Sequence, residues 1–185
     1  ASAMVQLMLR HNDQLEVSED ELLNFRQQFL DDYEADICVD SCLFDSLDAV
    51  LADLESKGVP WGIVTNKPRY LAEKLLNKMQ LDERCAALVC PDDVSRSKPD
   101  PEPMYMALEK LGIPRGAAGS VLYVGDHIRD IEAGNAAGMP TILAAYGYIP
   151  PEDQKTLKKW GADYIVETPE QLNKLLLSSG KFEYL

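Results

Sequence analysis

Two aspartates stand one helical turn apart, directly after an apolar run. Asp126 and Asp130 follow Val121–Val124, and Gly125 permits a tight turn before them. Residues four apart in a helix share a face, so both carboxylates can point toward one hard cation. Magnesium prefers one or two carboxylates, with waters and substrate phosphate completing an octahedron. In the structural alternative, Asp126 is a helix N-cap and Asp130 compensates the helix dipole.

A hydroxyl and an amide end a second apolar run. Thr65 and Asn66 close the run that begins at Trp61, and Pro68 follows two residues later. A Thr hydroxyl beside the free N–H groups of a helix start suits a phosphoryl oxygen. The alternative is that Thr65 and Asn66 merely cap a helix that begins near Pro68.

One lysine lies among prolines. Lys98 precedes Pro99, and Pro101 and Pro103 follow at alternate positions. Prolines stiffen the backbone, so this ammonium has few places to point. A rigidly held ammonium can neutralise both a carboxylate nucleophile and a transferring phosphoryl group. The alternative is a solvated surface lysine in a proline-rich turn.

The elements that must position these residues alternate along the chain. Each apolar run is too short for a helix and is bounded by Gly, Pro, Asn or Asp, which predicts buried parallel strands. The predicted strands are Trp61–Thr65, Ala87–Cys90, Val121–Val124, Thr141–Ala145 and Tyr164–Val166. Apolar residues recur at helical spacing between the runs, so we predict a three-layer α/β sandwich. Ligands of such a sheet bind beyond the carboxyl ends of the strands, where the polar residues above lie.

The first forty residues differ from the rest. Their apolar residues have helical spacing around Met4–Met8 and Leu22–Leu30, and Ser18 with Glu21 predicts a capping box. These residues are typical of an all-helical lobe. A last helix is predicted at Leu172–Leu177.

The charge balance limits the partners. Acidic residues outnumber basic ones 31 to 18, giving a net charge of −13. We therefore expect neither nucleic acid nor a membrane as partner, whereas a small phosphorylated metabolite can still be drawn to a few focused cations. The four cysteines form no CxxC pair, so we expect buried reduced thiols in a cytoplasmic protein.

Taken in this order, the threonine, the lysine and the paired aspartates resemble three of the four motifs of the haloacid dehalogenase superfamily. Val64–Pro68 and Ser97–Pro101 resemble its phosphoglycolate phosphatase group, and Ala145–Ile149 and Trp160–Asp163 resemble bacterial N-acetylmuramic acid 6-phosphate phosphatases. The resemblance implies a Rossmann-like core with an inserted helical cap.

The resemblance also implies a mechanism and roles for the candidate residues. An aspartate after the first strand attacks phosphorus to form an aspartyl-phosphate, which water hydrolyses, and a second aspartate acts as acid and base. In this sequence Thr65 would bind the phosphoryl group with Asn66 shaping the loop, and Lys98 would neutralise charge. Asp126 would hold Mg²⁺, with Asp130 supporting the metal.

The family's Asp-x-Asp-Gly-Thr motif is absent from this sequence. We therefore expect residues 1–37 to be a remnant of the helical cap and residues 38–185 to be a core lacking its first strand. This chain would then be a fragment without the nucleophile.

Several rival interpretations stay open. A dehalogenase needs no metal, which disfavours it, and a mutase usually has an acidic pair where Gly125-Asp126 stands. A non-catalytic module that binds a phosphorylated ligand or a protein is the rival from another class. His127, Arg129, Lys67 and Arg69 could contact substrate or be solvated residues of helix starts.

Overall fold

The computed structural model describes residues 18–178, and the chain divides after Ser41 into two units. In the first unit lies helix α2 (Glu19–Ala35). Its predicted capping box is confirmed, because Glu21 N donates to Ser18 Oγ and Ser18 N donates to the Glu21 carboxylate. The predicted helix around Met4–Met8 lies outside the described residues.

The second unit alternates strands with helices in the predicted order. Its strands are β1 (Gly62–Val64), β2 (Ala87–Val89), β3 (Tyr123–Gly125), β4 (Thr141–Ala144) and β5 (Tyr164–Val166). Its helices are α3 (Leu47–Ser56), α4 (Arg69–Lys78), α5 (Glu102–Lys110), α6 (Ile128–Ala136) and α7 (Pro169–Ser178), with 3₁₀ turns η1 (Pro91–Asp93), η2 (Arg115–Ser120) and η3 (Leu157–Trp160). No helix within residues 18–178 has the length and apolar character of a membrane span.

Strand β3 begins two residues later than the sequence predicted. Val121 still belongs to the preceding turn, because its N–H donates to Ala118 O at 3.0 Å. The ladder starts with Tyr123, whose N–H donates to Pro140 O. Gly125 is therefore the last residue of the strand and not part of the turn that follows it.

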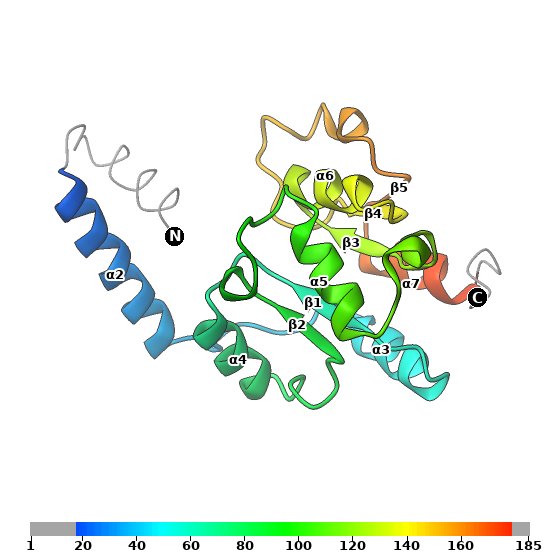
Figure 1. The fold of residues 1–185 in the computed structure, drawn as a ribbon, viewed down its shortest axis with the longest axis horizontal. Coiled ribbons are helices and arrows are strands. Elements are labelled where there is room, and N and C mark those ends of the chain that lie inside the picture. Colours follow the sequence, from blue (N-terminus) through cyan, green and yellow to red (C-terminus); the bar gives the residue numbers. More distant parts are fainter. Residues whose placement is uncertain (1–17, 179–185) are drawn as a thin grey trace. The chain divides into compact units, whose positions relative to one another are not determined.

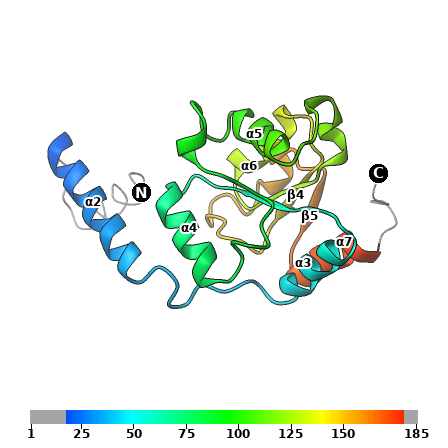
Figure 2. The same ribbon diagram turned by 60° about the horizontal axis from the view of Figure 1, so that its bottom comes forward.

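Helices cover both faces of the strands, which confirms the three-layer α/β prediction. Figure 2 shows α5 and α6 on one side of the strands and α3 with α7 on the other. On the first side, Met104 and Leu108 are fully buried, and both Val64 of β1 and Tyr123 of β3 pack against their cluster. A single apolar layer therefore holds β1 and β3 together.

The strands form two separate parallel groups within the described residues. Strand β1 pairs with β2, and β4 pairs with both β3 and β5. Figure 1 shows β2, β1, β3 and β4 following one another in this order across the molecule. No pairing joins β1 to β3, so among residues 18–178 no strand pairs with the inner edge of either.

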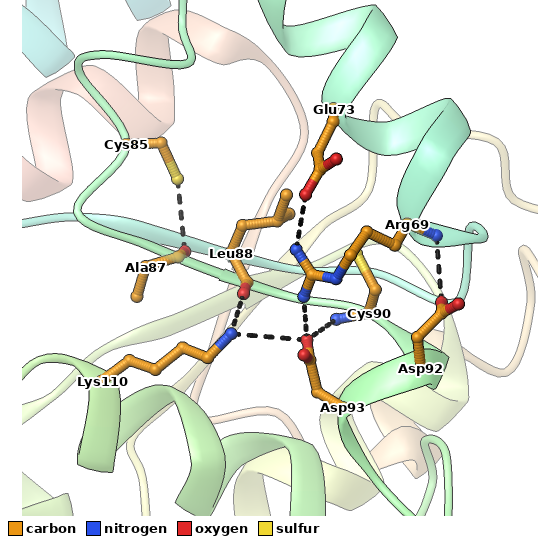
Figure 3. Close-up of polar contacts among 9 residues, drawn as sticks. All are labelled: Arg69, Glu73, Cys85, Ala87, Leu88, Cys90, Asp92, Asp93 and Lys110. Atoms are coloured by element: carbon orange, nitrogen blue, oxygen red, sulfur yellow. Dashed lines mark hydrogen bonds and ion pairs between the residues drawn. The ribbon is translucent and has the colours of Figure 1, made fainter.

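The outer edge of β2 is covered by charged side chains (Figure 3). Lys110 Nζ donates to Leu88 O at 2.7 Å and lies 3.4 Å from the Asp93 carboxylate. Arg69 pairs with Asp93 and Glu73 and stays partly exposed, so its charge is balanced within the chain. A hollow of about 480 Å³ beside this edge is lined by these paired ions and does not include Lys98 or Asp130.

The cysteines are only partly as predicted. Cys90 is buried and burial raises the pKa of its thiol, as expected for an inert core cysteine. Cys42, however, is exposed, because it lies in the irregular segment that precedes α3.

Asp93 joins the two cations of this edge to the backbone. Burial alone would raise the pKa of its carboxyl, but hydrogen bonds from Cys90 N and Arg69 and the charge of Lys110 outweigh burial. The pKa of Asp93 therefore lies below its ordinary value of 3.8. A carboxyl with a lowered pKa stabilises the fold when ionised, and the contribution disappears as pH falls through that pKa.

We predict that Asp93→Asn lowers the free energy of unfolding by about 1 kcal/mol at pH 7, because two partly exposed cations, Arg69 and Lys110, lose their shared anion. The difference from the parent chain should persist down to about pH 5 and shrink below about pH 4. Urea unfolding at several pH values measures both effects. Glu109→Gln, on an exposed position of α5, is the matched control and should change stability little. A deficit of equal size at pH 3 and pH 7 would contradict the ionic role of Asp93.

Candidate active site

The ammonium of Lys98 is the centre of the polar cluster at the carboxyl ends of β1 and β3. Its Nζ lies 2.6 Å from Asp130 Oδ1 and donates to Val64 O at 2.8 Å. The side chain is only 9% exposed, so the interpretation of Lys98 as a solvated surface lysine is wrong. A buried ammonium needs such partners, because an unpaired charge is costly away from water.

Tyr123 is a member of this cluster that the sequence analysis did not identify. Its hydroxyl accepts a hydrogen bond from Lys98 Nζ at 3.1 Å and donates to Asp130 Oδ1 at 3.4 Å. Burial, with the nearby charge of Asp130, raises the pKa of the Tyr123 phenol, so the group stays a neutral donor. The sequence offered one indication of this role, which is that Tyr123 is the only residue with a polar side-chain group in the run Val121–Val124.

Asp130 serves the helix and the lysine at the same time. His127 is the N-cap of α6, and its Nδ1 accepts from Arg129 N at 3.1 Å. Asp130 Oδ2 in turn accepts from His127 N at 3.2 Å, which completes a capping box. Capping therefore explains one of the two carboxylates, but that carboxylate is Asp130 and not Asp126.

Asp126 is held by the loop that follows β4. Its Oδ2 accepts from Tyr148 N at 3.2 Å, and Asp126 does not cap α6. Tyr148 is 91% exposed, whereas Tyr146 packs edge-on against Phe44 with ring centroids 5.0 Å apart. The backbone of Tyr148 therefore lies beside the Asp126 carboxylate, and its side chain is exposed.

Thr65 and Asn66 do not cap the following helix. Thr65 Oγ1 accepts from Lys67 N at 3.1 Å, and Asn66 is exposed. The N-terminus of α4 is instead served by Asp92, which accepts from Arg69 N at 3.0 Å (Figure 3). Thr65 directly follows Val64, whose carbonyl accepts a hydrogen bond from Lys98. The threonine and the lysine therefore lie next to each other in the site.

The carboxylates fit magnesium in kind but do not form a complete metal centre. No group of three or more His, Cys, Asp or Glu side chains within residues 18–178 is arranged to hold a metal. Two carboxylates are, however, what Mg²⁺ takes from proteins when waters and a substrate phosphate supply the rest. Asp126 and Asp130 are thus a compatible donor set for this ion.

Two glycines allow the carboxylates to lie where they do. A Cβ on Gly125 would lie 2.2 Å from Asp130 Cβ, and a Cβ on Gly147 would lie 2.4 Å from Asp126 Cβ. Such contacts are far inside van der Waals distance, so any side chain there would displace an aspartate. Gly125 is therefore required by close approach rather than by an unusual backbone conformation.

Comparison with known proteins defines the class. The sequence matches the family of haloacid dehalogenase-like hydrolases over residues 4–144. This chain belongs to that family, and the predicted class, a phosphatase of the haloacid dehalogenase superfamily, is confirmed.

Individual relatives agree with this class. The N-acetylmuramic acid 6-phosphate phosphatase of Pseudomonas putida is 46% identical over 154 residues, which are 83% of this chain and 67% of that protein. The phosphoglycolate phosphatase of Xanthomonas campestris is 43% identical over 145 residues, which are 78% of this chain and 63% of that protein. The crystal structure of a predicted phosphoglycolate phosphatase from Haemophilus somnus matches with a TM-score of 0.77 and 26% identity, over 92% of this chain and 73% of that one. The chain thus spans about two thirds of the length of these relatives.

We predict that Gly125→Ala destabilises the chain by about 1–3 kcal/mol, because the new methyl group overpacks against Asp130. Gly116→Ala is the matched control, since no atom lies within 4 Å of a Cβ at that position. Denaturant unfolding of both variants measures the difference. Equal unfolding midpoints for the two variants would contradict the prediction, because they would show that the loop around Gly125 accommodates a methyl group without loss of stability.

Proposed function

We propose that this chain supplies the phosphate-binding and metal-binding part of a magnesium-dependent phosphomonoesterase that works through an aspartyl-phosphate. The observation that carries the proposal is the buried Lys98 ammonium, held by Val64 O and Asp130 between the carboxyl ends of β1 and β3. A cation fixed at this point stabilises negative charge that develops on a phosphoryl group without reorganising.

The nucleophile, in this proposal, is an aspartate on a strand that the 185 residues do not contain. A carboxylate oxygen of that aspartate attacks phosphorus, and the bond from phosphorus to the substrate oxygen breaks as that oxygen takes a proton from a second aspartate. Water then gives its proton to this second aspartate and attacks phosphorus. The aspartyl–phosphorus bond breaks, releasing inorganic phosphate.

The residues of this chain have supporting roles in both steps. The Thr65 hydroxyl and the backbone of Asn66 bind phosphoryl oxygens, and Lys98 neutralises the nucleophile and the phosphoryl group together. Asp126 and Asp130 would hold Mg²⁺, which supplies further neutralisation of phosphate charge. Tyr123 keeps Lys98 and Asp130 in position through its neutral hydroxyl.

The substrate is, in this proposal, a small phosphorylated metabolite of the type that the relatives' names print, N-acetylmuramic acid 6-phosphate or phosphoglycolate. The exposed side chain of Tyr148, a residue whose backbone N–H contacts Asp126, favours the sugar phosphate. An aromatic ring offers a rigid, amphipathic surface to the apolar face of a pyranose, and glycolate has no such face. A phosphate-release screen with both compounds separates the two.

In a protein that joins this chain to an Asp-x-Asp strand, we predict that Lys98→Ala and Asp126→Asn each lower kcat by a factor on the order of 100 or more. Lys78→Ala and Glu132→Gln remove the same charges from exposed positions of α4 and α6 and should leave kcat unchanged. Phosphate release with added Mg²⁺ is the measurement. Full activity of the Lys98→Ala enzyme would refute the proposed role of the ammonium.

We predict that the 185-residue chain by itself does not hydrolyse p-nitrophenyl phosphate in the presence of Mg²⁺. Within the described residues, the carboxylate that contacts Lys98 is Asp130, and it is already bonded to His127 N. Magnesium-dependent hydrolysis that Asp126→Ala abolishes would show that a nucleophile is present after all.

A further inference from the structure

The loop that carries Lys98 is closed by the carboxylate of Glu102, the first residue of α5. Ser95 N donates to Glu102 Oε1 at 2.9 Å, and Arg96 N donates to Glu102 Oε2 at 2.9 Å. The Ser95 hydroxyl lies 3.0 Å from Oε1 and 2.8 Å from Oε2. Glu102 therefore ties together the two ends of the segment 95–102, and Lys98 lies in the middle of that segment.

A second carboxylate, that of Asp100, braces the same loop. Asp100 Oδ1 accepts from Glu102 N at 2.9 Å, and Asp100 N donates to Ser97 O at 3.1 Å. Arg96 pairs with both acids, because its Nη1 lies 3.2 Å from Asp100 Oδ2 and its Nε lies 3.6 Å from Glu102 Oε2. The Arg96 side chain is 72% exposed, so water screens these two ion pairs. The hydrogen bonds from the backbone to Glu102 are therefore the main closure of the loop.

This closure is more than the usual service of an acidic residue to a helix start. A carboxylate in the first turn of a helix stabilises the helix dipole whichever way it points. Glu102, however, accepts from groups six and seven residues earlier, outside α5. The hydrogen bonds from Ser95 lower the pKa of Glu102 below its ordinary value, so the carboxylate is ionised at neutral pH. Hydrogen bonds to an ionised acceptor are roughly twice as strong as those between neutral groups.

The ammonium of Lys98 has to reach partners on other elements. It lies 2.8 Å from Val64 O, at the end of β1, and 2.6 Å from Asp130 Oδ1 in α6. A lysine side chain loses much rotamer freedom when it is fixed, and a mobile loop beneath it would add a loss of backbone freedom. A loop that Glu102 has already ordered removes this second cost, so the ammonium is placed in advance of any ligand.

From these contacts we infer that Glu102 is a positioning residue for the phosphatase reaction: by closing the loop 95–102, it holds the Lys98 ammonium at the carboxyl ends of β1 and β3. The inference rests on the proposed function of Lys98 and adds to it a residue that acts through the lysine. A displacement of about 1 Å at a charge-stabilising group can cost on the order of 100-fold in rate, so a residue of this kind affects catalysis without touching the phosphate.

The first test is a double-mutant cycle in the protein that joins this chain to an Asp-x-Asp strand. We expect Glu102→Ala to lower kcat roughly tenfold or more, but to have no further effect in a Lys98→Met enzyme, because residues that act through one another are not additive. Glu102→Gln, which keeps one acceptor oxygen, should recover part of the loss. Glu109→Ala removes an exposed carboxylate from the same helix and should leave kcat unchanged.

The second test needs no activity and uses the 185-residue chain. The ¹H–¹⁵N signal of the Lys98 ammonium, assigned by its loss in Lys98→Met, should shift and broaden in Glu102→Ala and, to a smaller extent, in Glu102→Gln, but not in Glu109→Ala.

The outcomes separate this inference from the proposed function. An equal loss of kcat from Glu102→Ala with and without Lys98, or an ammonium signal that neither Glu102 variant changes, would overturn the positioning role. Full activity of the Lys98→Met enzyme would refute the proposed function of the lysine instead, while a changed ammonium signal would still support the hold of Glu102 on its loop.

Discussion

One buried ion pair joins the elements on which the site depends. The Lys98 ammonium contacts Asp130, which follows β3, and the carbonyl of Val64, which ends β1. Removing one partner of such a pair leaves an uncompensated charge, which is far more costly than never having built the pair. The lysine therefore fixes the positions of two groups of strands that share no backbone hydrogen bond. Its own position is set by Tyr123, whose hydroxyl contacts both members of the pair.

The chemistry of the site follows from how few cations it contains. The chain carries a net charge of −13, so an anionic substrate is repelled by most of the surface. Arg69 and Lys110 are both partly exposed and both pair with Asp93 at the outer edge of β2, where Arg69 also pairs with Glu73. Lys98 is also paired, but its partner Asp130 is one of the two carboxylates that would bind magnesium in the proposed function. A metal at that point would loosen the hold of Asp130 on Lys98 and leave the ammonium more available to a phosphoryl group.

The sequence predicted the elements well because the signals are local. Apolar runs bounded by Gly, Pro and Asn located all five strands of the second unit, and Ser18 with Glu21 located the start of α2. It failed where contacts between distant residues decide the outcome. Asp92 lies in the loop after β2 and caps α4, and Arg69 finds Asp93 across 24 positions, neither of which spacing can reveal. For the same reason Tyr123 was missed and Gly125 was interpreted as a turn residue, although its role is to make room for the Asp130 side chain.

Water and the Lys98 ammonium satisfy the inner edges of β1 and β3, between which no strand of residues 18–178 lies. A backbone group that is buried and unpaired costs about 1–3 kcal/mol, and several would leave little of the marginal stability of a domain. The exposure of Val124 shows that water reaches this side of β3, so its backbone groups can be hydrated rather than orphaned. Val64 O, deeper in the site, receives the Lys98 ammonium instead of water. For this one carbonyl the ammonium thus takes the place of the backbone partner that the inner edge of β1 otherwise lacks, so the residue that prepares the site for phosphate also satisfies the backbone beside it.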